Sequence, residues 1–133
     1  MDATIVFPNQ LFKSSPALSR KREIFILQDP LFFSDTEYPA TFHKNKLLLH
    51  LLSNDYYRQE LSDSGYDVQI IELEQLQNQD NYISFFKKNN ITEIYFCDPV
   101  DYVITKRLDI ATKKLKLKTY KFLMVDKLLQ LVH

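Results

Sequence analysis

Polar side chains that could do chemistry follow several short apolar runs of this sequence. These side chains are Asn9, Gln10, Gln28, Asp29 and Asp98. Amides and carboxylates in such places could hold a ligand by hydrogen bonds, and paired carboxylates could perform acid–base catalysis. Aspartates that precede helices are more often caps, so we interpret Asp98 and Asp101 as helix caps.

The residue types that mark common cofactor sites are scarce. His43 and His50 lie seven residues apart on an expected helix, whereas a metal site would need closer spacing and further ligands, so we favour structural roles for both. The single cysteine, Cys97, ends an apolar run and is interpreted as a buried thiol. The single glycine, Gly65, cannot supply a dinucleotide-binding turn or a phosphate loop, which argues against conventional NAD or ATP binding.

Composition predicts one globular domain over residues 1–133, because 45% of the residues are hydrophobic. Seventeen basic residues balance 17 acidic ones, so we expect no autonomous DNA binding. The lysine-rich stretch 113–121 fits a helix end followed by a strand better than a nucleic-acid site. The sequence has no apolar segment of membrane-spanning length and no basic leader at its start, so a cytoplasmic protein without membrane contact is expected.

Hydrophobic periodicity predicts alternating strands and helices. Short β-branched or aromatic runs at 3–7, 23–27, 66–71, 91–97 and 117–123 predict strands. Amphipathic spacing predicts helices over 43–63, from Asp80 to 88, and from Asp98 or Asp101 to about 115. The resulting fold class is α/β: a three-layer, Rossmann-like or flavodoxin-like five-stranded parallel sheet with helices on both faces.

Ligands in such sheets bind at the carboxyl ends of the strands, where the strand order reverses. Here that edge would comprise residues 8–10, 28–30 and 98–99. An aromatic loop follows the second strand and contains Phe32, Phe33, Tyr38 and Phe42. It could line a pocket for a flat ring or lie against the sheet, and the sequence leaves both interpretations open.

Several stretches in order resemble the N-terminal α/β domain of photolyase-related proteins. They are residues 4–12, 15–18, 24–33, 42–50, 65–68 and 98–102. The resemblance is strongest to the prokaryotic branch of the cryptochrome/photolyase family that includes iron–sulfur photolyases. It implies that a much larger helical domain carries FAD, the iron–sulfur cluster and the damaged-base pocket used in DNA repair. The chain by itself would then be non-catalytic, with that flavin-binding helical domain as its partner in cis or in trans.

The same resemblance implies a site for an antenna chromophore, a ribityl lumazine in the iron–sulfur branch. Its position implies contacts from Asn9, Gln10, Leu11, Gln28, Asp29, Pro30, Phe32 and His50. Phe32 stands near the place of a ring-contacting carboxylate in lumazine-binding members, and Glu37 could substitute for that group.

Two other classes of function remain open. The chain could be a stand-alone protein-interaction module of the same fold, with the apolar stripe of residues 128–132 as a candidate surface. It could also be a small nucleotide-binding or hydrolytic enzyme that uses Asp29 or Asp98, although it lacks a nucleophile motif and a phosphate loop.

Overall fold

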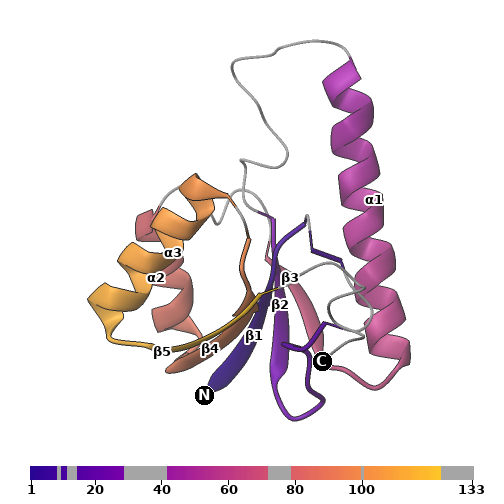
Figure 1. Ribbon diagram of the computed structural model, residues 1–133. Helices are drawn as coiled ribbons and strands as arrows, with labels where there is room; N and C mark the ends of the chain where they lie inside the picture. Colours follow the sequence, from indigo (N-terminus) through magenta and orange to yellow (C-terminus); the bar gives the residue numbers. More distant parts are fainter. Residues whose placement is uncertain (9, 12–14, 29–41, 72–78, 100, 124–133) are drawn as a thin grey trace.

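Strands and helices alternate along the chain in the predicted order (Figure 1). The computed structural model describes residues 1–8, 10–11, 15–28, 42–71, 79–99 and 101–123, with the backbone only for 42–50 and 79. The strands are β1 (Asp2–Val6), β2 (Glu23–Leu27), β3 (Val68–Ile71), β4 (Glu93–Cys97) and β5 (Lys118–Phe122). The helices are α1 (Phe42–Asp63), α2 (Gln79–Lys88) and α3 (Tyr102–Leu115).

The five strands form one parallel sheet with the order β3-β2-β1-β4-β5. The chain first builds outward from β1 to β3, then returns to the other side of β1 with β4. Because crossovers between parallel strands are right-handed, this reversal places α1 on one face and α2 and α3 on the other. The predicted fold class is confirmed, and the strand order is that of the Rossmann fold.

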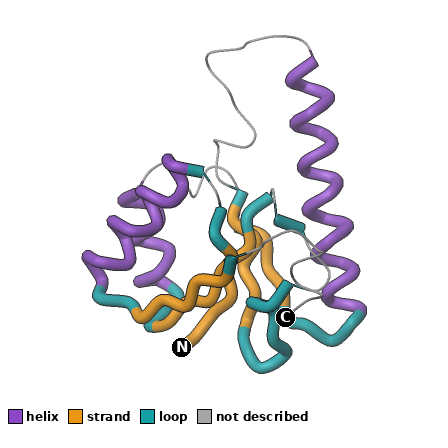
Figure 2. The backbone as a smooth tube through the Cα atoms, viewed as in Figure 1, coloured by secondary structure: helices purple, strands orange, loops and turns teal. Residues whose placement is uncertain are grey.

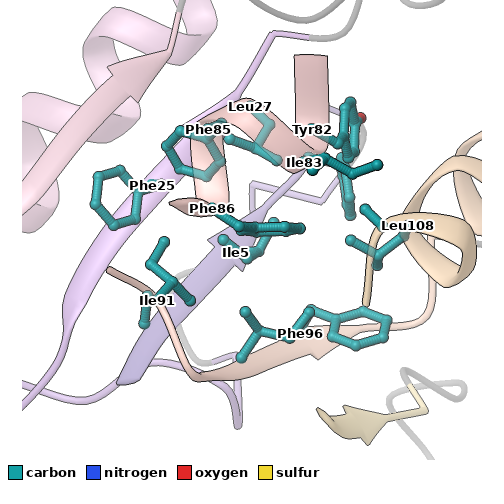
Figure 3. Close-up of a cluster of buried hydrophobic side chains, with 14 of the residues drawn as sticks. Ile5, Phe25, Leu27, Tyr82, Ile83, Phe85, Phe86, Ile91, Phe96 and Leu108 are labelled. Atoms are coloured by element: carbon teal, nitrogen blue, oxygen red, sulfur yellow. The ribbon is translucent and has the colours of Figure 1, made fainter. Parts of the chain in front are cut away.

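The larger hydrophobic core lies between the sheet and the pair α2 and α3 (Figure 3). Alternate residues of the central strands point into it, and Phe25 meets Phe85 edge-to-face with ring centroids 5.1 Å apart. Phe86, which is fully buried, packs beside Phe85. The near-continuous apolar character of β1 and β2 follows from this arrangement, since both strands are covered on both faces.

A smaller core lies beneath α1, on the opposite face of the sheet. Val6, Ile24 and Ile26 pack there against Tyr57 and Leu61 of the helix. The tube view shows α1 as the helix covering this face, with its N-terminal half reaching beyond the carboxyl ends of the strands (Figure 2). One flank of α1 therefore has no neighbouring helix among the described residues.

Helix ends explain where the observed boundaries differ from the predicted ones. The strands predicted from Tyr66 and Ile91 begin two residues later, because the N–H groups of these residues bond to the carbonyls that end α1 and α2. Gly65 has the predicted left-handed conformation, with φ of 91°. Asp80 lies in the first turn of α2 and not at its cap, because the helix begins at Gln79.

Candidate functional site

Gln10 connects the carboxyl ends of two strands at the place where the strand order reverses. Its side chain is 6% exposed, and its Nε2 donates hydrogen bonds to the carbonyl oxygens of Cys97 at 3.2 Å and Asp98 at 2.6 Å. A turn in which the Gln10 N–H donates to the Phe7 oxygen fixes its backbone. Gln10 thus bridges β1 and β4 in the crevice where ligands of open α/β sheets bind.

Two amide side chains keep buried polar atoms without hydrogen-bond partners in the described part of the chain. They are Oε1 of Gln10 and both Nδ2 and Oδ1 of Asn54, which lies on α1 and is 0% exposed. Leaving a buried polar group unpaired costs about 1–3 kcal/mol. Native proteins retain such groups where a ligand or an ordered water completes the hydrogen bonds.

A groove of about 440 Å³ runs along the open flank of α1. It is lined by Leu11, Leu52, Ser53, Tyr56, Tyr57 and Glu60. Leu52 and Tyr56 are 58% and 69% exposed. Leu11 follows Gln10 in the sequence, and Ser53 precedes Asn54. The groove walls therefore belong to the two segments that carry the unpaired amides.

Tyr57 forms the inner wall of this groove and is only 3% exposed. Burial raises the pKa of its phenol well above the ordinary value, and the nearby groups Cys97, Tyr66 and Glu60 raise it further. The phenol is therefore neutral at physiological pH. The Cys97 thiol is buried as predicted and lies 3.2 Å from the Ser15 hydroxyl.

Three of the predicted site residues fall in the described part of the chain. Gln10 and Gln28 are buried at the carboxyl ends of β1 and β2, and Leu11 is half-buried against the core beneath α1. The backbone of His50 belongs to α1, but its side chain lies outside the described residues. Asn9, Asp29, Pro30, Phe32 and Glu37 also lie outside them, as do Phe33, Tyr38 and residues 124–133.

The two aspartates near α3 have different roles. Asp101 is the N-cap, as predicted, and its carboxylate accepts a hydrogen bond from the Ile104 N–H at 3.0 Å. The same interpretation was wrong for Asp98. Its N–H donates to the Phe122 oxygen and extends the pairing of β4 with β5. Asp98 is not the cap of α3, because this helix begins at Tyr102 and the residue just before it is Asp101.

Asn54 is the candidate residue that the sequence analysis missed. It precedes the buried residues Tyr57 and Leu61 by three and seven positions, so all three share one face of α1. An asparagine on the buried stripe of an amphipathic helix was therefore a detectable signal. It was overlooked because the helix contains many polar residues on its other faces.

Stacked side chains lie on β4 and β5, on the face of the sheet opposite the larger core. The rings of Tyr95 and Tyr120 stack 4.3 Å apart, and the Arg22 guanidinium lies 3.6 Å from the centre of the Tyr95 ring. Lys118, from the lysine-rich stretch, lies over Tyr120. These contacts agree with the structural interpretation of that stretch.

Metal and membrane sites are not found in the described part of the chain. No group of three or more histidine, cysteine or acidic side chains there could hold a metal ion. Among the described helices, none combines the length and the apolar character needed to cross a bilayer.

Sheet order, helix placement and the polar crevice at the strand-order reversal define an α/β protein of the Rossmann-like class. The chain belongs to the deoxyribodipyrimidine photo-lyase-related protein family, whose model matches residues 4–129. The predicted resemblance is thereby confirmed. The chain is also 33% identical over 108 residues to an uncharacterized protein of Acanthamoeba polyphaga mimivirus. That match covers 78% of this chain and 54% of the viral protein, so the chain spans about half the length of this relative.

Proposed function

We propose that this chain is a non-catalytic, cytoplasmic α/β domain that docks a flavin-binding helical domain and seats an antenna chromophore at the carboxyl edge of its sheet. The observation that carries the proposal is an apolar groove whose lining residues Leu11 and Ser53 adjoin, in the sequence, the buried and unpaired amides of Gln10 and Asn54. A buried polar group next to an apolar wall is the usual composition of a small-molecule site.

An antenna needs placement and a dry pocket, and it needs no acid–base machinery. The side chains of the groove fit this requirement, because Leu11, Leu52, Tyr56 and Tyr57 supply apolar surface for a flat ring. The neutral phenol of Tyr57 adds no charge. Ribityl lumazine is the candidate chromophore that the family resemblance implies, and folate and deazaflavin are two further ring compounds to compare with it.

Docking of a helical domain would cover the open flank of α1. Leu52 and Tyr56 are large and exposed there, and no described helix lies beside them. The viral relative is about twice as long as the matched region, which is consistent with further structure packed against a domain of this kind. In this proposal FAD and DNA repair reside on the partner domain, because a net charge of zero gives this chain no general attraction to DNA.

Titration of the purified chain with the three chromophores, followed by fluorescence quenching, tests the antenna role. We expect saturable binding that weakens in Gln10→Ala and Phe32→Ala variants. Gln59→Ala is the matched control, because Gln59 is exposed on α1 and, among the described residues, bonds only to Asp63 in the same helix. If none of the three chromophores binds, the antenna role is wrong.

A second candidate function is protein interaction through the outer face of α3. Tyr102 is 78% exposed, and Val103 and Ile110 are also exposed on this short helix. A shallow pocket between Tyr102 and Ile110 could receive an apolar side chain of a partner. If a Tyr102→Ser variant loses a co-purifying protein but still binds a chromophore, protein interaction belongs to this separate surface on α3.

A further inference from the structure

β3 forms one edge of the sheet (Figure 1). It pairs with β2 on one side, and no strand in the described part of the chain lies on its other side. Two hydrogen bonds show which of its backbone groups point inward. The Ile24 N–H donates to the Asp67 oxygen at 2.8 Å, and the Gln28 N–H donates to the Ile71 oxygen at 3.0 Å. Positions 67 and 71 therefore direct their backbone groups towards β2.

Val68 and Ile70 direct their backbone groups the other way. Along a strand of a parallel sheet, the N–H and C=O of one residue point to one neighbouring strand, and those of the next residue point to the opposite side. Gln69 lies between two inward positions at a spacing of two, so it also bonds to β2. The open edge thus offers two N–H donors and two carbonyl acceptors, which is the pattern that another extended backbone completes.

A groove of about 550 Å³ lies beside this edge, between β3 and α2. Ile71 packs against the larger core, so Gln69, two residues earlier, faces the same side of the sheet. Ile71 and the buried Phe85 give the groove apolar walls. Lys88, in the last turn of α2, is the one charged side chain among the described residues that line it. An occupant with a carboxylate would therefore complement the groove.

We propose that the edge of β3 and this groove bind an extended acidic peptide segment of a partner protein, which adds to the sheet as a further strand. Backbone pairing with Val68 and Ile70 provides the attraction. Every second side chain of the peptide enters the groove against Ile71 and Phe85, and a carboxylate among them pairs with Lys88. The groove lies on the α2 side of the sheet, opposite α1, so this surface is independent of the proposed chromophore site.

A synthetic peptide of alternating valine and glutamate, blocked at both ends and labelled with a fluorophore, is the probe. Titration with the full chain, followed by fluorescence anisotropy, should show saturable binding. A control peptide with the same side chains but N-methyl groups on alternate backbone nitrogens cannot donate the pairing hydrogen bonds, so it should bind about tenfold more weakly or worse. A peptide of alternating valine and lysine should bind about twofold more weakly or worse, because exposed ion pairs contribute little.

Hydrogen exchange of the backbone amides, measured by nuclear magnetic resonance, identifies the surface. In the free chain the amides of Gln69 and Ile71 should exchange slowly, because they bond to β2, whereas those of Val68 and Ile70 should exchange rapidly. Peptide at about ten times its dissociation constant should slow the two outward amides by about tenfold. Unchanged exchange of Val68 and Ile70 overturns the proposal, as does equal binding of the N-methylated peptide or no binding of any peptide.

Two variants at one position separate the backbone from the side chain. Val68→Pro removes an outward N–H and keeps the pairing with β2, since proline is tolerated at the first residue of an edge strand. Peptide binding should weaken about threefold to tenfold, whereas Val68→Ala, which keeps the N–H, should leave it nearly unchanged. Circular dichroism verifies the fold of both. If sedimentation shows a dimer of the chain that Val68→Pro dissociates, the edge pairs with a second copy and the peptide proposal is wrong.

Discussion

Replacing Asn54 by leucine should stabilise the ligand-free protein. The two side chains have the same branched arrangement of four heavy atoms, and Asn54 lies fully buried on the face of α1 that packs against the sheet. Neither amide atom has a hydrogen-bond partner in the described part of the chain. The folded state therefore bears the desolvation of the amide without compensation, whereas the unfolded chain hydrates it.

The size of the effect follows from this unpaired group. Removing a buried unsatisfied amide gains about 1–3 kcal/mol, and the apolar side chain of leucine adds a smaller hydrophobic gain against Tyr57 and Leu61. For a domain of this length, each kcal/mol raises the melting temperature by roughly 3–5 °C. We therefore expect an increase of about 3–15 °C in Asn54→Leu.

Thermal unfolding by circular dichroism measures the change, and Asn89→Leu is the matched control. Asn89 follows α2, and its Nδ2 donates a hydrogen bond to the Phe85 oxygen at 2.9 Å, so its replacement should lower the melting temperature by removing a made bond. A lower melting temperature in Asn54→Leu as well would show that Asn54 is satisfied in the ligand-free protein. An ordered water would then be the partner, and a ligand would not be needed to explain this residue.

Three further perturbations test the energetics of the fold. Because burial raises the pKa of Tyr57, its contribution to stability is complete below the unfolded pKa of about 10 and is lost as pH rises towards the folded value. Urea unfolding at pH 8 to 11 should show the wild type losing stability relative to Tyr57→Phe above about pH 10, and parallel pH dependence in the two proteins would contradict this. Lys116 has a left-handed φ of 56° after α3, so Lys116→Gly should gain about 0.5–1 kcal/mol, whereas Lys114→Gly inside the helix should lose about 1 kcal/mol in the same urea assay. Equal losses in both would refute the left-handed strain. Phe86 is fully buried against Tyr82 and Phe85, so Phe86→Ala should cost about 3–5 kcal/mol in urea unfolding, and a cost below about 1 kcal/mol would refute its place in the core.

Local patterns in the sequence were enough to predict the strands, the helices and the fold class. The apolar run 23–27 matches β2 in full, and the spacing of leucines and tyrosines places α1 within one residue of its observed start. The cap at Asp101 and the left-handed turn at Gly65 were also predictable. Each of these features depends on residues close in sequence, whose preferences act over one or two turns or a few strand residues.

Strand order and the composition of the site depended on tertiary structure. The sequence allowed either a Rossmann-like or a flavodoxin-like order, and the return of β4 to the side of β1 decided between them. Gln10 was a predicted contact residue, but its bridge to Cys97 and Asp98 joins positions 87 and 88 residues apart. Whether the amide atoms of Asn54 find hydrogen-bond partners likewise depends on which groups pack against its face of α1. Hydrophobic periodicity reports which face of an element is buried, whereas a hydrogen bond between distant segments, or the lack of one, is decided only when the packed chain brings their atoms together.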